Sequence, residues 1–152
     1  MNIRIEFTHF TITELLYKMM ENDSKQFYKN TTDEEIDQIT QGRLFIEKEM
    51  RNCFFQLVTD LKTSIKDEPV RKLELSVQFH FTIDHDVDIE VMEEKDEALK
   101  AIQEQFGGSI LEFCKNRISM IIRQITSLDY QPPIINESVS VEINKQIKED
   151  GL

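Results

Sequence analysis

Residues 73–91 of the chain read LELSVQFHFTIDHDVDIEV, and this stretch has the clearest periodicity in the sequence. Apolar residues occupy nearly all of its odd positions, and polar residues occupy the even positions. Such alternation is typical of a β-strand with one buried and one solvated face, as found in antiparallel sheets. The pattern predicts a strand over 71–91, whose apolar face is interrupted only by Arg71 and His85.

Three weaker alternating segments precede this strand. We expect strands over 3–12, 39–50 and 53–66, with an acidic surface loop over 21–37. In the first segment the alternation changes phase after His9, which indicates a β-bulge. Together with the strand described above, these segments predict a four-stranded antiparallel sheet.

The apolar period changes from two to about 3.6 residues over 93–126, which predicts a long helix. Gly107 and Gly108 interrupt it, and each glycine costs about 1 kcal/mol relative to alanine inside a helix. We therefore expect a break or kink there, with Ser109 as the cap of the second half. Residues 127–152 predict an extended segment with two prolines, a short strand over 139–143 and a polar tail from Asn144 onwards that we expect to fray.

These elements predict one α+β domain over 1–152, in which the four-stranded sheet (about 1–91) packs against the long broken helix. Apolar side chains sweep about 200° around the second half of the helix, whereas one packing face needs about 100°. One flank can cover the sheet and the other is then left exposed, so we expect copies of the chain to associate through this helix. The expected interface residues are Ile110, Cys114, Ile118, Ile121, Ile122 and Ile125.

The composition excludes several classes of partner. The chain has 18 basic and 29 acidic residues and a net charge of −11, which argues against binding to nucleic acid or to an anionic membrane surface. No apolar run approaches the roughly 20 residues that span a bilayer, and no secretory signal is visible, so we expect a cytoplasmic protein.

Cys53 and Cys114 lack the spacing of metal ligands and predict two buried thiols, with one disulfide as the alternative.

No motif predicts an enzyme, a metal or a cofactor. His9, His80 and His85 are scattered, with His80 expected on the exposed face, and no nucleophile motif or phosphate-binding loop occurs. On a strand, Asp84, Asp86 and Asp88 share one face at a spacing of about 6.6–6.8 Å. A weak calcium site is one interpretation of this run, but a solvated acidic face is favoured because the chain has no EF-hand spacing.

The segment over 109–136, SILEFCKNRISMIIRQITSLDYQPPIIN, resembles the SecB protein-export chaperones. That family has an apolar pair, a Pro-Tyr-Ala-Arg-Glu stretch, an Ile-Ser pair and a later Pro-Pro-Ile-Asn signature. The corresponding residues here are Ile110-Leu111, the stretch over 112–116, Ile118-Ser119, and the segment over 132–136, which is one residue longer. Two features depart from the family: Glu112 replaces its proline, and 139–143 predicts a strand where the family has a second helix.

The resemblance implies an ATP-independent holdase without a cofactor, built as a dimer or a dimer of dimers. It implies that non-native polypeptides, including preproteins for export, bind in apolar grooves between helix and sheet. Candidate groove residues are Phe79, Phe81, Phe106, Phe113, Tyr130 and Ile134, with ordinary core packing as the alternative for the phenylalanines. A translocase motor is a further implied partner, although no acidic residues here match its docking site. The alternative function is a SecB-fold protein dedicated to one partner, such as an antitoxin.

Overall fold

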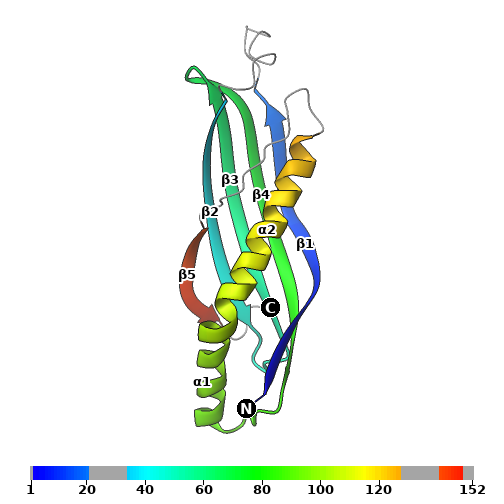
Figure 1. Cartoon of the computed structure of the whole chain (residues 1–152), viewed down its shortest axis with the longest axis vertical. Helices are drawn as coiled ribbons and strands as arrows, with labels where there is room; N and C mark the ends of the chain where they lie inside the picture. Colours follow the sequence, from blue (N-terminus) through cyan, green and yellow to red (C-terminus); the bar gives the residue numbers. More distant parts are fainter. Residues whose placement is uncertain (1, 21–33, 128–140, 149–152) are drawn as a thin grey trace.

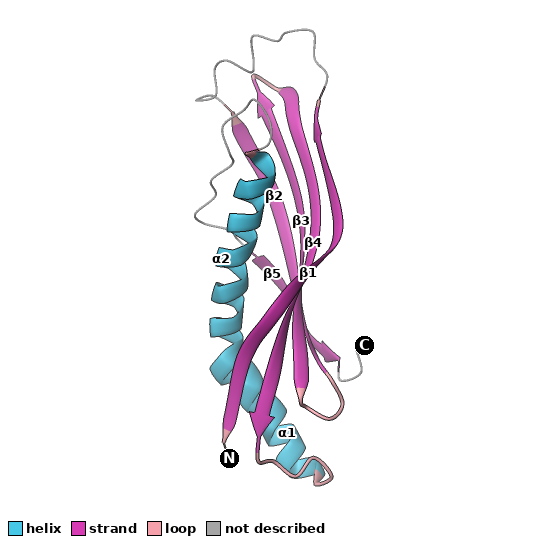
Figure 2. Ribbon diagram, turned by 90° about the vertical axis from the view of Figure 1, so that its right-hand side faces the viewer, coloured by secondary structure: helices cyan, strands magenta, loops and turns pink. Residues whose placement is uncertain are grey.

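The computed structural model describes residues 2–20, 34–127 and 141–148. One long, twisted sheet carries two helical segments on one of its faces (Figures 1 and 2). In chain order the elements are β1 (Ile3–Met19), β2 (Glu35–Ile46), β3 (Asn52–Ile65), β4 (Glu68–His85), α1 (Met92–Ala101), a π-helical turn (Ile102–Phe106), α2 (Gly107–Thr126) and β5 (Val141–Lys148). The predicted segment with two prolines, and with it Tyr130 and Ile134, lies outside the described residues.

The strand order of the sheet is β1-β4-β3-β2-β5. Strands β1 to β4 pair antiparallel, which confirms the predicted four-stranded sheet. Strand β5 adds to the edge of the sheet in parallel with β2. It extends to Lys148, so the prediction of a frayed tail from Asn144 onwards is wrong for the first five residues of that tail.

Several strand ends differ from prediction, with β1 extending to Met19, and local turns override the alternating pattern at the ends of β4 and β2. Strand β4 ends at His85 rather than 91, since the Asp88 side chain accepts a hydrogen bond from the Glu90 backbone N–H and turns the chain toward α1. Strand β2 lies four residues earlier than predicted at both ends. Its C-terminal turn places Met50 at a φ of 57°, where the Met50 N–H donates to the Glu47 carbonyl.

Strand β1 contains two β-bulges, and the first confirms the predicted change of phase. The register with β4 shifts at Thr8 and again at Thr13. Each threonine hydroxyl donates to a β4 carbonyl, that of His80 for Thr8 and that of Ser76 for Thr13. Because each bulge adds one residue, the apolar side chains that follow return to the face that carries the helices.

On the opposite face of the sheet, an aromatic row crosses four strands. The Phe45 and Phe54 rings stack at 4.6 Å between centroids, Phe54 lies 5.8 Å from His80, and His80 stacks on His9 at 4.4 Å. His80 is therefore half-buried, not exposed as predicted. Its burial, and to a lesser extent the neighbouring His9, lower the pKa of His80.

The helical region is continuous through the position of the predicted break. The π-helical turn links α1 to α2, and the helix axis bends there (Figure 1). Gly107 begins α2 without a side-chain cap, and Ser109 lies inside the helix, so the prediction of Ser109 as a cap is wrong. The bend is accommodated by the wider π turn, so no new N-terminus is exposed that would need a cap.

A buried ion pair closes the end of the sheet where β1 leads into β2. Arg71 lies on the core face of β4, and its guanidinium donates through Nε and Nη2 to the two carboxylate oxygens of Glu34 at 2.8 and 2.5 Å. Both side chains are almost completely shielded from solvent. The pair explains how a cation is accommodated on an otherwise apolar face.

We expect Glu34→Ala to destabilise the fold by about 3–5 kcal/mol, because it removes the carboxylate that accepts two hydrogen bonds from the buried Arg71 guanidinium. Urea denaturation followed by circular dichroism measures the loss. The double variant Glu34→Leu/Arg71→Met should recover most of it, since apolar side chains then replace both buried charges. If Glu34→Ala is as stable as the natural chain, the pair does not hold this end of the sheet.

The two cysteines confirm the prediction of buried free thiols. Cys53 on β3 and Cys114 on α2 are both in the core. Burial, with a smaller contribution from the Glu47 charge, raises the pKa of Cys53 to about 12. Burial and the nearby Cys53 also raise the pKa of Cys114.

These thiols should resist alkylation at pH 8 in the folded chain. A rise in pKa from 9.0 to about 12 lowers the thiolate fraction of Cys53 by roughly 1000-fold. Mass spectrometry after iodoacetamide treatment should show both thiols modified only in denaturant. Because the folded-state pKa values are raised, the folded chain keeps protons that the unfolded chain releases, so stability should fall above about pH 9. Rapid labelling of the folded chain would contradict this assignment.

Candidate functional site

The described residues of the predicted client groove do not share one environment. Phe79 and Phe81 on β4 are 0% and 5% exposed and pack in the core, which is the alternative given above to a role in the groove. Phe106, at the end of the π-helical turn, and Phe113 on α2 are half-buried and pack against the edge of that core. The two β4 rings therefore offer almost no surface to a partner.

Exposed apolar side chains lie instead on β1. Phe10, Ile12 and Leu15 are 42%, 40% and 51% exposed. They pair in register with Phe79, Val77 and Leu75, whose side chains point toward the helices, so these β1 side chains lie on the same face of the sheet. The sheet thus presents apolar surface on its helix-bearing side at an edge strand.

The course of β1 explains this exposure. Its first residues lie close to the helices, whereas its later half runs on the side of the sheet away from α2 (Figure 2). Bulges increase the local twist of a strand, and β1 contains two of them, at Thr8 and Thr13. The helix therefore covers Ile3 to Phe7 in part but leaves the side chains of Phe10, Ile12 and Leu15 open to solvent.

An aromatic cluster joins the first part of β1 to α2. The Phe7 ring lies 4.7 Å from Phe113 and 5.7 Å from Phe81, between centroids. The Arg117 guanidinium carbon lies 5.2 Å from the Phe113 centroid and 5.8 Å from the Phe7 centroid. This cation covers the two half-buried rings at the solvent boundary.

One flank of α2 continues this apolar surface. Phe113, Arg117 and Met120 follow each other at helical spacings of four and three residues, so they lie along one side of the helix. Since Phe113 contacts β1, this is the flank beside β1, and Met120 on it is 54% exposed. We define the β1–α2 surface by its exposed residues Phe10, Ile12, Leu15 and Met120 and its half-buried residues Phe7 and Phe113.

The residues expected at an oligomer interface lie inward from this flank. Ile110, Cys114, Ile118, Ile121 and Ile122 are buried in the core by the sheet of their own chain, and Ile125 is partly buried against it. The expectation that the sheet leaves a broad apolar stripe of the helix uncovered is therefore wrong. A long, strongly twisted sheet covers a wider arc of the helix than a flat layer does. Met120 lies outside the covered arc, since it is 54% exposed. Self-association itself stays a prediction.

The acidic run at the end of β4 does not form the predicted common face. Since β4 ends at His85, Asp86 and Asp88 lie in a loop and lose the strand spacing that a cation site would need. Within residues 2–20, 34–127 and 141–148, no group of three or more His, Cys, Asp or Glu side chains is arranged to hold a metal ion.

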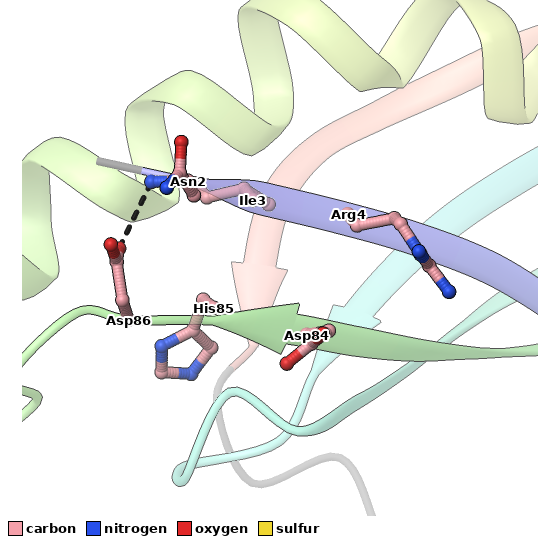
Figure 3. A pocket seen from close by; sticks show the side chains of 6 residues that line it. All are labelled: Asn2, Ile3, Arg4, Asp84, His85 and Asp86. Carbon is pink, nitrogen blue, oxygen red and sulfur yellow. Dashed lines mark hydrogen bonds between the residues drawn. The ribbon is translucent and has the colours of Figure 1, made fainter.

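A cavity of about 370 Å³ lies beside this run. It is lined by Asn2, Ile3, Arg4, Asp84, His85 and Asp86 (Figure 3). Asp86 accepts a hydrogen bond from the Asn2 backbone N–H at 2.9 Å, and this bond lowers the pKa of Asp86. The backbone N–H of Val87 donates to His85 Nδ1, which makes His85 a structural histidine at the end of the strand. The contacts here attach the start of β1 to the end of β4.

The sequence contains a partial signal for the β1–α2 surface. The alternation and change of phase in 3–12 indicated which β1 residues face the helix, but not that the helix leaves some of them uncovered. Leu15 lies beyond the predicted end of that strand.

In the described part of the chain, neither α1 nor α2 has the length and apolarity of a membrane span.

Comparisons with known proteins show a relationship in structure alone. No protein-family model matches the chain, and no curated protein matches it in sequence. The structure is similar to the Rv1957 SecB-like chaperone of Mycobacterium tuberculosis, solved in complex with a ChAD peptide from the Rv1956 HigA1 antitoxin. That match has a TM-score of 0.62 and 13% identity, and covers 90% of this chain and 91% of that chain.

A protein of unknown function from Streptococcus agalactiae also matches, with a TM-score of 0.38 and 10% identity over 91% of this chain and 100% of that chain. At 13% identity, the match to the Mycobacterium tuberculosis protein establishes a fold and no more. The four antiparallel strands and the long helix of this chain have the SecB-like fold.

Proposed function

We propose that the chain is an ATP-independent chaperone that holds non-native polypeptide segments on its β1–α2 surface. The observation that carries this proposal is the row of exposed apolar side chains on β1, next to the aromatic cluster that joins β1 to α2. Large apolar side chains exposed together on one face of a polar, acidic chain are typical of an interaction surface.

The chemistry of this surface suits unfolded clients. An extended polypeptide offers apolar side chains, and burial of apolar area is worth about 25 cal/mol per Å². Methionine and phenylalanine can contact varied side chains, which favours broad over strict selectivity. The net charge of −11 would keep a chaperone with a bound apolar client in solution. Preproteins awaiting export are one class of client that fits this description.

A second function has a specific observation in its favour. The similar Mycobacterium tuberculosis protein was solved with a peptide from an antitoxin, which shows that this fold can hold one defined polypeptide. A SecB-fold protein dedicated to a single partner would use the same surface. It would yield one dominant interactor from cell extract and would not protect unrelated clients from aggregation.

Assembly and location complete the proposal. We propose self-association as a dimer or a dimer of dimers in the cytoplasm, with a translocase motor as a further partner of an export chaperone. Strand β1 is an edge strand, so its exposed side chains are also available to another copy of the chain. Sedimentation velocity over a range of concentrations tests the assembly, and a monomer at all of them would remove it.

The triple variant Phe10→Thr/Ile12→Thr/Leu15→Thr tests the holdase proposal. Threonine keeps strand propensity while removing apolar surface. If clients bury about 100 Å² on these side chains, the loss is about 2.5 kcal/mol, or roughly 70-fold in affinity. Light scattering of several chemically unfolded proteins after dilution should show delayed aggregation with the natural chain and little delay with the triple variant.

A matched control uses the other face of the sheet. Leu16→Thr/Ile39→Thr removes two exposed apolar side chains that point away from the helices and should leave protection unchanged. The oligomeric state of each variant is measured in parallel, so that a loss of assembly is not mistaken for a loss of client binding. If the natural chain in molar excess delays none of the clients, the general holdase proposal is wrong.

A further inference from the structure

We infer that Arg117 gives the β1–α2 surface a preference for extended polypeptide segments in which a carboxylate side chain neighbours apolar residues. This inference rests on the proposed function, since it names a feature of the segments that the same surface holds. It concerns one cation at the boundary between the apolar surface and solvent.

The guanidinium of Arg117 lies over aromatic rings. It covers Phe113 and Phe7 at centroid distances of 5.2 and 5.8 Å, and the side chain is exposed to solvent. A guanidinium over a ring uses its planar face for the cation–π contact. Neither ring offers an oxygen acceptor, so these contacts leave the five N–H donors of the guanidinium available to an acceptor from outside.

Its two ring contacts distinguish Arg117 from the other basic side chains of the described residues, some of which, such as Arg123, also lack a carboxylate within 4.0 Å. Several other basic side chains have carboxylate partners within the fold: Arg4 with Glu6, Arg71 with Glu34, Lys72 with Glu74, Lys100 with Glu104, and Lys115 with Glu112. Across the described residues, no carboxylate oxygen lies within 4.0 Å of the Arg117 guanidinium. In a chain with 29 acidic and 18 basic residues, a cation held on rings without an acidic neighbour is available to a carboxylate from outside.

The geometry selects the kind of segment that would supply this carboxylate. Arg117 lies between Phe113 and Met120 on the flank of α2 beside β1, so a ligand that reaches it also covers apolar side chains. An Asp or Glu side chain can accept two parallel N–H bonds from the guanidinium. Its apolar neighbours in an extended segment would then contact Met120 on α2 and the exposed residues of β1.

Peptide binding measured by fluorescence anisotropy tests the inference. Three labelled peptides share an alternating sequence of Leu, Phe and Ser and differ only at the central residue, which is Glu, Gln or Lys. The natural chain should bind the Glu peptide about fivefold more tightly than the Gln peptide, as expected for a partly exposed ion pair, and the Lys peptide most weakly. High salt should reduce the difference.

Variants on α2 separate the role of Arg117 from the net charge of the chain. Arg117→Gln should abolish the preference between the Glu and Gln peptides, and Arg117→Glu should favour the Lys peptide. Arg123→Gln removes an equal charge from an exposed site on the same helix and should leave the preference intact. Circular dichroism and thermal unfolding check that each variant is folded.

The outcomes distinguish this inference from the proposed function. Failure of all three peptides to bind would overturn the proposed function, and the inference with it. Equal binding of the three peptides would leave the chaperone proposal standing and would overturn the preference. If Arg117→Gln changes the oligomeric state and not the peptide preference, the carboxylate comes from another copy of the chain, and the inference is wrong.

Discussion

The structure depends on how much of a wide, twisted sheet a single helix can cover. A helix with its side chains is about 10–12 Å across, whereas neighbouring strands lie about 4.8 Å apart, so one helix covers the width of two or three strands. Here α2 covers the middle of the sheet, and its buried face packs on the apolar faces of β2, β3 and β4. The edge strand β1 is beyond this cover for much of its length. Its exposed apolar side chains follow from that geometry.

The two bulges in β1 determine what the uncovered edge presents. Each turns the next residues so that the apolar side chains stay on the helix-bearing face, and each threonine hydroxyl ties the strand to β4. Bulges also make an edge less suitable for indiscriminate strand pairing. The result is a surface on which side chains, more than free backbone groups, are offered for binding. The Phe7–Phe113 contact and the Arg117 cation mark where this surface meets the helix.

Local turn chemistry accounts for most differences between the predicted and observed elements. The alternation in 71–91 continues past His85 to Val91 in sequence, yet the Asp88 turn ends β4 at His85 and removes the common face of the three aspartates. The helical period continues across Gly107, and a π-helical turn provides the expected bend in place of a new cap. In both cases periodicity identified the element correctly, while hydrogen bonds specific to one or two residues set its limits.

The sequence by itself determined the class of fold, since period-two and period-3.6 patterns require a sheet with one apolar face and a helix to cover it. It also determined which face of β4 lies on the core, including Leu75 and Val77. Only the tertiary structure decided which apolar residues stay exposed. Exposure depends on the width of the helix, the twist of the sheet and the position of β1 at its edge, and none of these is encoded in the periodicity of one segment. For this reason the apolar surface lies on β1, and the helix residues predicted to form an interface are buried beneath their own chain.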